Sequence, residues 1–574
     1  MLENLEEYTE KLIEEFEAIS KDAERVQKET LRSILEENAS AEYLQSLGLN
    51  GKTDPESFKA IIPLVTHDDL EPYIKRIFDG DNSPILTGKP IPAITLSSGT
   101  TKGKSKYVPW NETFLDSGVQ ILHTAFAIRD RELPIKNGKC LSIVYLSAQS
   151  QTKGGLKLGT IASHVIGNKR YTEAMAAIKS EMCSPQEVIS APDFQQAMYC
   201  HLLCGLIFRD QIQLLEALFI HSIVQAFRTF EQVWEELCND IREGVLNSRI
   251  TIPSVRAAMS KILKPDPEKA NLIHKICTGL NNWYGVIQEL FPNAKYLLAI
   301  ATGSMEAYLP SVRHYAGELP VVTNDYGASE GWVGTNLHPT VPAEFASYTV
   351  FPNCGYYEFI PLSEDAIACV DPKPVGLTEV KVGEEYEIVM TTRTGLYRYK
   401  LGDVVKVTGF YNSTPELKFI RRSGTLLSIN IDKNTENDLR LAVVAASKVL
   451  AEEKLEVVDY TSHVDSSQGL GHYVILFEIS GEASEEVLGE CCNSLEKSFV
   501  DAGYTSSRKV NNIGPLELRV VRPGTFQKIF DHFIGMGASP TQLKTPRCVP
   551  PTSTKVMQIL NDNVLNKYIS TVFN

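Results

Sequence analysis

The chain has 574 residues, more than one ordinary hydrophobic core accommodates, so the sequence predicts at least two domains. Hydrophobic residues make up 43% of the chain and charged residues 22%, which is typical of a globular protein. The formal net charge of −15 disfavours nucleic acid or an anionic membrane as the main partner, because both attract a basic surface.

The sequence shows no targeting signal, membrane span or metal cluster. Residues 1–7 are acidic and lack the basic and apolar parts of a signal peptide. The longest apolar stretches are too short, or too often interrupted by polar residues, to span a bilayer. The 11 cysteines lack paired spacing, so we expect buried, reduced thiols rather than disulfides or a zinc site. A soluble, cytoplasmic protein is therefore predicted.

The first half of the chain combines predicted helices with short predicted strands. Apolar residues recur at helical spacing over residues 1–47 and indicate two helices. Residues 60–110 are predicted to alternate short strands with Gly and Pro turns, and the apolar run 91–95 is the strand of most interest. Residues 185–300 are predicted to be mostly helical, with 226–245 as the clearest amphipathic case.

The second half contains two kinds of β structure. Residues 340–420 are β-rich, with alternating polarity at 384–390 and 396–410. From about residue 425 short strands alternate with helices, which suits a small sheet covered on one face by helices. The elements expected there are a helix capped by Asn434 or Thr435 and reaching 453, strands at 455–460, 472–479 and 516–521, and helices at 485–502 and from 525.

Together these elements predict an α/β (α+β) fold of two domains. Residues 1–424 are expected to form a large, multilayered domain with β-sheets, in part a β-barrel, and helices. Residues 425–574 are expected to form a small, mobile α/β domain.

A loop rich in hydroxyl groups, glycine and lysine follows the strand predicted at residues 91–95. It reads LSSGTTKGKSKYVP over residues 96–109. Small residues let consecutive backbone N–H groups face one concavity, and hydroxyl and ammonium groups add donors to phosphate oxygens. The spacing is not that of a Walker loop. Taken alone such a loop is more often a surface turn, but two later segments favour a phosphate site.

These segments are NDYGASEGW at residues 324–332, after a short apolar strand, and GLYRYKLGDVV at 395–405, in the β-rich region. In chain order, the three segments resemble the motifs of adenylate-forming enzymes. Those motifs are a Ser/Thr/Gly phosphate loop with a following lysine, a Tyr-Gly-x-Ser/Thr-Glu segment and a Tyr-Arg-x-Gly-Asp-like segment. Each match is weak alone, but three in order strongly indicate nucleotide chemistry.

Over nearly its whole length the sequence resembles the plant Gretchen Hagen 3 family of acyl acid amido synthetases. Within that family, residues 325–332 are most similar to the branch that conjugates jasmonate. The segments that carry the resemblance are 70–74, 97–109, 183–185, 199–203, 302–305, 313–315, 325–332, 395–405, 514–517 and 544–548.

The resemblance implies an ATP- and Mg²⁺-dependent ligase that forms an amide bond. The enzyme would adenylate jasmonate, release pyrophosphate, and join the acyl group to an L-amino acid, expected to be isoleucine, with release of AMP. Such a site needs fixed cations and N–H donors more than a strong base, because charge concentrates on the phosphates.

The resemblance also assigns roles to individual residues. Lys106, Glu330 and Lys555 would be catalytic, with Glu330 holding Mg²⁺ through oxygen, and Asp403 would accept the ribose hydroxyls. The nucleotide would be bound by Thr95, Ser97, Ser98, Gly99, Thr100, Thr101, Leu115, Gly118, Tyr326, Gly327, Ser329, Asp403 and Lys555. The acyl acid and the amino acid would be bound by Ser98, Thr160, Ile161, Ala162, Ser163, His164, Val165, Ile166, Asn324, Asp325, Trp332 and Lys528, with Thr160 to Ile166 expected as a strand.

Other functions stay open at this level. The acyl acid could be an auxin or a benzoate, or the acceptor could be the thiol of coenzyme A. A hormone-binding protein without turnover is a third alternative, against which Lys106, Glu330, Asp403 and Lys555 argue. The expected partners are small molecules only, with neither nucleic acid nor membrane, and we expect a monomer acting in jasmonate signalling and plant defence.

Overall fold

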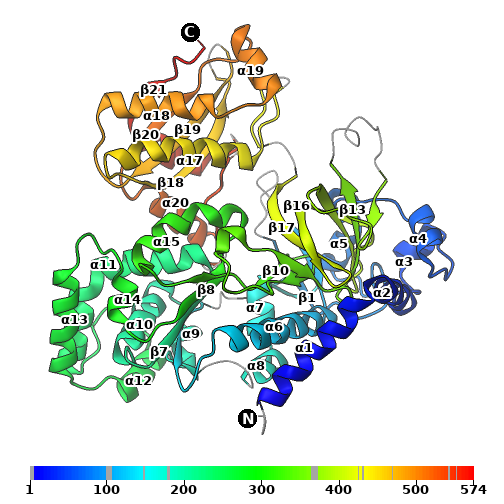
Figure 1. Cartoon of the computed structure of the whole chain (residues 1–574), viewed down its shortest axis with the longest axis horizontal. Helices are drawn as coiled ribbons and strands as arrows, with labels where there is room; N and C mark the ends of the chain where they lie inside the picture. Colours follow the sequence, from blue (N-terminus) through cyan, green and yellow to red (C-terminus); the bar gives the residue numbers. More distant parts are fainter. Residues whose placement is uncertain are drawn as a thin grey trace. The chain divides into compact units, whose positions relative to one another are not determined.

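The computed structural model describes residues 5–97, 106–145, 149–176, 181–362, 373–423, 426–429, 432–467, 470–540, 543–550 and 553–573. These residues form two compact units (Figure 1). The first runs to Ser97, from Tyr107 to Leu401 and from Val405 to Phe419, and the second contains Lys106, residues 402–404 and the chain from Ile420 onward. Helices and sheets are mixed in both units, as the sequence predicts.

Five helices begin the first unit. They are α1 (Leu5–Lys21), α2 (Ala23–Glu37), α3 (Glu42–Ser46), α4 (Pro55–Ile61) and α5 (His67–Asp79). The prediction of short strands from residue 60 is wrong at α5. Helix α5 begins there because the Asp69 carboxylate accepts hydrogen bonds of 2.7 Å from both the backbone N–H and the hydroxyl of Thr66. It ends at Gly80, whose φ of 105° is left-handed.

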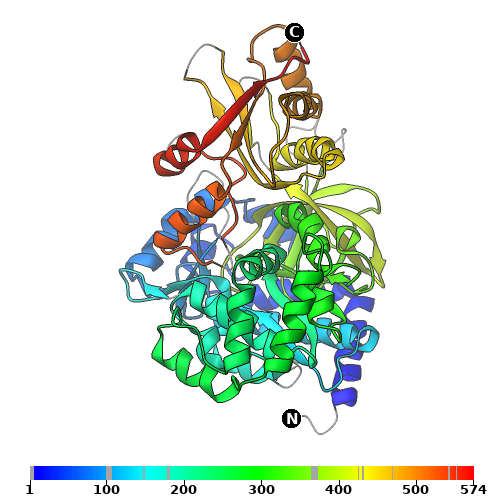
Figure 2. The same ribbon diagram turned by 90° about the vertical axis from the view of Figure 1, so that its left-hand side faces the viewer.

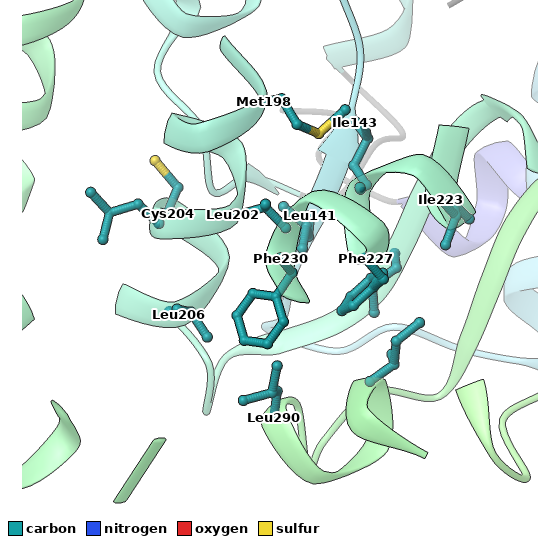
Figure 3. Close-up of a cluster of buried hydrophobic side chains, with 14 of the residues drawn as sticks. Leu141, Ile143, Met198, Leu202, Cys204, Leu206, Ile223, Phe227, Phe230 and Leu290 are labelled. Carbon is teal, nitrogen blue, oxygen red and sulfur yellow. The ribbon is translucent and has the colours of Figure 1, made fainter. Parts of the chain in front are cut away.

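A five-stranded parallel sheet, in the order β6-β3-β7-β8-β9, supports the helical part of this unit. One face of the sheet, with Leu141, Leu215 and Leu297, packs against the helical core. Figure 3 shows Leu141 of this face together with Leu202 of α10 and Phe227 of α11. The strands are β3 (Lys139–Ile143), β6 (Glu181–Met182), β7 (Ile212–Phe219), β8 (Tyr296–Ile300) and β9 (Val321–Val322). The helices are α8 (Lys169–Ala176), α9 (Gln186–Ile189), α10 (Phe194–Ile207), α11 (Ile220–Glu243), α12 (Pro253–Ile262), α13 (Pro267–Gly279), α14 (Val286–Leu290) and α15 (Leu309–Ala316), with single 3₁₀ turns at Gly303–Tyr308 and Ala343–Phe345.

Two further sheets complete the first unit. An eight-stranded sheet has the order β10-β11-β12-β17-β16-β15-β13-β14, and a four-stranded sheet has the order β2-β1-β5-β4. The larger sheet shares a buried core with α2, α4 and α5. Its strands are β10 (Asp325–Gly327), β11 (Trp332–Thr335), β12 (Tyr348–Val350), β13 (Tyr356–Pro361), β14 (Val375–Gly376), β15 (Glu385–Thr391), β16 (Tyr399–Tyr411) and β17 (Thr414–Arg422). The smaller sheet contains β1 (Ala93–Leu96), β2 (Tyr107–Trp110), β4 (Ser150–Gln151) and β5 (Lys157–Gly159), and is flanked by α6 (Glu112–Glu132) and α7 (Ile161–Ile166).

The second unit has a four-stranded sheet, β18-β19-β20-β21. Its elements are β18 (Val457–Asp465), β19 (His472–Ile479), β20 (Glu517–Val521), β21 (Val564–Ile569), α17 (Glu436–Glu452), α18 (Glu485–Lys497), α19 (Ala502–Lys509), α20 (Thr525–Gly535) and α21 (Thr554–Asp562). Thr435 caps α17 as predicted, and its hydroxyl and backbone N–H both donate to Asp438. The predicted helix 485–502 is instead two helices, because the Asp501 carboxylate accepts from the N–H groups of Gly503 and Tyr504 and starts α19.

The prediction that helices cover one face of this sheet is wrong. Val474 and Leu476 of β19 pack with residues of α20 and α21, whereas Tyr473, on the opposite face, contacts the ring of Tyr504 at 4.8 Å. Figure 2 shows α21, in red, on the other side of the sheet from α17. The sequence analysis missed α21 and β21, which complete this second layer.

The helices and the cysteines show two general features of the chain. In the described part of the chain, no helix combines the length and apolar character needed to cross a membrane. Ten cysteines are described, of which nine are buried and Cys548 is half-buried. Burial raises the pKa of the Cys354 thiol to about 12, and that of Cys238 to about 11.

Candidate active site

Strand β1 leads into the hydroxyl-rich loop and β2 leads out of it. Their antiparallel pairing ends at Leu96 and Tyr107, which fixes both ends of the loop. Thr95 is fully buried, and its hydroxyl has no hydrogen-bond partner among the described residues. Ser97 and Lys106 are partly exposed at the two ends. The predicted phosphate-binding residues Ser98, Gly99, Thr100 and Thr101 lie outside the described residues.

The β10–β11 hairpin holds the candidate carboxylate. Ala328 and Gly331 exchange backbone hydrogen bonds of 2.8 and 3.3 Å, which makes a tight turn around Ser329 and Glu330. Glu330 is only 4% exposed, although it lies at the end of a hairpin. Its Oε1 accepts a hydrogen bond of 3.3 Å from the Tyr399 hydroxyl of β16. The described residues offer Glu330 no cationic partner within ion-pair distance.

This buried carboxylate is suited to holding a divalent cation. A buried charge costs free energy unless it is paired or binds a metal. In the described residues, no group of three or more His, Cys, Asp and Glu side chains could hold a metal. Mg²⁺ commonly binds through one or two carboxylates while phosphate and water supply the other oxygens. Glu330 therefore fits Mg²⁺ that arrives with a nucleotide, and not a cage built from protein ligands alone.

Trp332 at the start of β11 is tightly enclosed. A Cβ at Gly118 of α6 would lie 2.7 Å from the Trp332 Nε1, and one at Gly327 would lie 2.8 Å from its Cε3. The ring also contacts Phe114, at 5.7 Å between centroids. Leu115, on the same helix, is buried in the adjoining cluster. The sequence-predicted residues Leu115, Gly118, Gly327 and Trp332 are thus brought together around one indole ring.

Tyr326 precedes this ring on β10 and is 7% exposed. It contacts Tyr348 at 5.5 Å and Phe419 at 6.3 Å between ring centroids. These contacts fix its ring in the core of the large sheet. The stacking of adenine on Tyr326 stays a prediction.

Thr160 to Ile166 form a helix and not the expected strand. Strand β5 ends at Gly159, and the Thr160 hydroxyl accepts from the Ser163 N–H at 3.2 Å, which begins α7. Ile161, Val165 and Ile166 pack beside Trp110 in the core, and Ala162 is partly buried. The apolar residues of this segment therefore serve the core as well as any pocket.

Ser163 and His164 line a cavity of about 260 Å³ with Ala93, Trp110, Gln149 and Lys157. His164 lies 3.0 Å through Nε2 from the Ile94 carbonyl and 3.3 Å through Nδ1 from the Gln149 amide nitrogen. These contacts assign the proton to Nε2, which donates to the carbonyl. Burial lowers the pKa of His164, which favours the neutral ring.

Asn324 and Asp325 begin the same hairpin as Glu330. The Asn324 side-chain oxygen accepts a hydrogen bond of 2.7 Å from Nη1 of Arg129, whose Nε donates to the Tyr296 hydroxyl at 3.1 Å. Asn324 therefore joins the hairpin to α6. Arg129, 9% exposed, was missed by the sequence analysis. Its position near the end of a helix gave no signal of this contact. Asp325 is partly buried.

The remaining predicted residues belong to the second unit. Asp403 is 2% exposed, and its Oδ1 lies 2.8 Å from Nε of Arg422. Burial, with Arg422 as the next cause, lowers the pKa of Lys544 to about 8, although Glu436 and Asp403 act in the opposite direction. Sequence reasoning assigned no role to this lysine.

Lys528 on α20 and Lys555 on α21 are exposed. Lys528 donates a hydrogen bond of 2.8 Å to Asn563, and Lys555 one of 3.2 Å to Gln558. Both ammonium groups are therefore held by neighbouring amides of their own unit.

Comparisons with known proteins agree on one family. The GH3 family N-terminal domain matches residues 12–321, the GH3 family central domain residues 348–422, and the GH3 family C-terminal domain residues 437–553. Jasmonoyl–L-amino acid synthetase JAR4 of Nicotiana attenuata is 62% identical, over 98% of each chain. Jasmonoyl–L-amino acid synthetase GH3.5 of Oryza sativa subsp. japonica is 56% identical, over 98% of this chain and 99% of that protein.

A solved structure extends the likeness to the fold. It is the structure of AtGH3.15 acyl acid amido synthetase in complex with 2,4-DB, and its sequence is 35% identical to this chain. The two structures superpose with a TM-score of 0.89, over 100% of this chain and 99% of that chain. The hairpin with its buried carboxylate, the hydroxyl-rich loop between β1 and β2, and these matches define the class. The chain belongs to the GH3 family.

Proposed function

We propose that the chain is an ATP-dependent ligase that adenylates jasmonate and transfers the acyl group to the amine of an L-amino acid, with isoleucine the expected acceptor. The proposal is supported by the similarity over nearly the full chain to two proteins named as jasmonoyl–amino acid synthetases. We also propose that the enzyme works as a monomer in the cytoplasm, in jasmonate signalling and defence. The auxin, benzoate and coenzyme A alternatives become arms of the test below.

The proposed reaction has two balanced steps. A carboxylate oxygen of jasmonate attacks the α-phosphorus of ATP, and the bond from that phosphorus to the α,β-bridging oxygen breaks to release pyrophosphate. The amine of the amino acid then attacks the acyl carbon, loses a proton to solvent or to a nearby base, and displaces AMP. Bound Mg²⁺ would neutralise phosphate charge in the first step.

The described residues have distinct parts in this proposal. Glu330 would hold the metal, and Asp403 would accept hydrogen bonds from the ribose hydroxyls. Lys106, at the end of the hydroxyl-rich loop, would supply a cation to the phosphates. Trp332 would form a wall of the acyl pocket, and the cavity beside Ser163 and His164 would receive the amino acid. Lys528 and Lys555 would act from the second unit, whose movement would separate the two half-reactions.

One observation carries the nucleotide part of this proposal. Glu330 is buried at the end of a hairpin, without a cation among the described residues, and a tyrosine hydroxyl donates to one of its oxygens. Burying a carboxylate without a cationic partner costs free energy of folding, so a role in stability alone does not account for Glu330. A cation that arrives with the substrate would offset this cost, which supports the proposal.

The test is acid-dependent exchange between ATP and labelled pyrophosphate, followed by product analysis. Jasmonate, indole-acetate and benzoate are each offered, and isoleucine, aspartate and coenzyme A are then compared as acceptors. Jasmonate with isoleucine should give the highest kcat/KM. Valine and leucine should compete, because one methylene discriminates by only about 1–3 kcal/mol. Indole-acetate with aspartate as the best pair would refute the substrate assignment, and a thioester as the main product would refute the amide ligase.

A further inference from the structure

Arg398 has an unusual backbone for an arginine. It lies in the GLYRYKLGDVV segment, immediately before β16, and its φ is +46°. A non-glycine residue in this left-handed region is strained and persists only where its surroundings fix it. Its N–H donates to the Thr391 hydroxyl at 2.9 Å, and its carbonyl accepts from the Val65 N–H at 3.1 Å. Both backbone polar groups are therefore held by other segments.

The Arg398 side chain is held still more firmly. Nε and Nη2 each donate to one oxygen of Glu358, both at 2.9 Å, in a bidentate ion pair that is almost fully buried. Nη1 donates to the carbonyls of Lys59 and Ile62, at 2.9 and 2.8 Å. Four of the five guanidinium N–H groups are thus used inside the first unit. Arg398 serves the fold of this segment and not the binding of phosphate.

Two buried tyrosines flank this arginine and differ in their partners. The Tyr397 hydroxyl donates to the Leu86 carbonyl at 2.7 Å. The Tyr399 hydroxyl donates to Oε1 of Glu330 at 3.3 Å. Both rings are at most 1% exposed, so neither hydroxyl can exchange its partner for water. Tyr399 connects the strained segment to the candidate metal carboxylate, and Tyr397 does not.

We propose that Tyr399 and the Glu358–Arg398 ion pair are positioning residues for Glu330. The ion pair fixes the strained backbone, the backbone fixes Tyr399, and the Tyr399 hydroxyl occupies Oε1 of Glu330. Oε2 of Glu330 accepts no hydrogen bond from the described residues and remains for the cation of the metal–nucleotide complex. This inference rests on the proposed role of Glu330 in nucleotide binding, and it identifies three further residues on which that role depends.

A purely structural role for these residues makes a different prediction. A tyrosine hydroxyl lost from the core would then matter through stability alone, and Tyr397 and Tyr399 would be equivalent. Y397F and Y399F are therefore a matched pair. Each removes one buried hydroxyl from the same segment without changing the ring, but only Y399F removes a donor to Glu330.

The measurement is the binding of Mn²⁺ in the presence of ATP, by electron paramagnetic resonance of free Mn²⁺, on the full-length chain without acyl acid. Y399F should weaken Mn²⁺ binding about tenfold, the effect expected from losing a hydrogen bond to a charged group. Y397F should change Mn²⁺ binding less than twofold, while its Tm falls as much as that of Y399F. E358Q should weaken Mn²⁺ binding as Y399F does.

The double variant Y399F/E358Q provides the decisive comparison. If Glu358 acts through Tyr399, the double variant should bind Mn²⁺ no more weakly than either single variant, whereas independent effects would multiply. R398K keeps the positive charge but loses the planar guanidinium that binds both oxygens of Glu358. It should bind Mn²⁺ with an affinity between those of the wild type and E358Q. If E358Q fails to fold, the comparison of Mn²⁺ binding by Y399F and Y397F still tests the inference.

Two results would overturn the inference. One is Mn²⁺ binding by Y399F equal to that of the wild type, and the other is an equal loss of Mn²⁺ binding in Y399F and Y397F. The proposed function fails separately, when the wild-type chain binds Mn²⁺ with ATP but no acyl acid supports pyrophosphate exchange. In that case the positioning of Glu330 would hold for a nucleotide site with another reaction.

Discussion

Replacing Gly118 with alanine tests the packing around Trp332. A Cβ at this position would lie 2.7 Å from Nε1 of Trp332, 2.8 Å from its Cε2 and 2.9 Å from its Cζ2. Real Cβ atoms do not approach this closely, so the indole or helix α6 must move. The indole has little room, because the Gly327 backbone also lies close to it: a Cβ there would lie 2.8 Å from Cε3.

The expected change in stability combines two opposing terms. Overpacking a core costs about 1–3 kcal/mol. Replacing glycine with alanine at a compatible site gains about 0.4–1 kcal/mol, because the unfolded chain loses freedom. G118A should therefore be neutral or less stable by up to about 2.5 kcal/mol. A Cβ added at Gly489 on α18 would meet no atom within 4 Å, so G489A should gain about 0.4–1 kcal/mol.

The functional assay is steady-state kinetics with jasmonate and isoleucine. If Trp332 forms a wall of the acyl pocket, a displaced ring should lower kcat/KM for jasmonate about tenfold or more, since 1.4 kcal/mol corresponds to a factor of ten. The KM for ATP is measured alongside, because the resemblance also assigns Gly118 to the nucleotide site. G489A should match the wild type in both constants. A G118A variant as stable as G489A, with unchanged jasmonate kinetics, would refute the reasoning about this contact.

Two further predictions concern the second unit. D403A should raise the KM for ATP about tenfold to a hundredfold, through the loss of about 1.5–3 kcal/mol of hydrogen bonding to a charged group, and an unchanged KM in a folded variant would remove Asp403 from the site. Lys544 has a pKa of about 8 in the fold, below its ordinary 10.5, so the unfolded chain binds more protons between these values and the unfolding free energy should rise with pH across them. K544M should be more stable than the wild type at pH 7 and should lack this rise in urea denaturation. An identical pH dependence in both proteins would contradict the assignment.

Local signals in the sequence predicted several elements well. The strand before the hydroxyl-rich loop, the capped start of α17 and strand β19 all follow from short patterns of polarity and capping. The start of α5 carried an equally local signal, in Thr66 and Asp69, but it was outweighed by the Gly and Pro residues nearby. At Thr160 the chain changes from strand to helix within one residue. The segment is too short for its hydrophobic periodicity to reveal this change.

Other features depend on contacts between distant parts of the chain. Arg129 and Asn324 are 195 positions apart, and Glu358 and Arg398 are 40 apart. Nothing in the residues around either partner specifies the other, because the fold brings them together. The motifs therefore located Glu330 and Asp403 as candidates, while the residues that hold Glu330 in place became visible only in three dimensions.

The state of the cysteines bears on the fate of the proposed acyl-adenylate. Such a mixed anhydride acylates thiolates readily, so an accessible sulfur nearby would divert the acyl group onto the enzyme. Nine of the ten described cysteines are buried, and burial raises the pKa of Cys200, Cys277 and Cys492 to about 12. At neutral pH these three groups are protonated and therefore poor nucleophiles. Within the described part of the chain, buried sulfur does not compete with the amine for the activated acyl group.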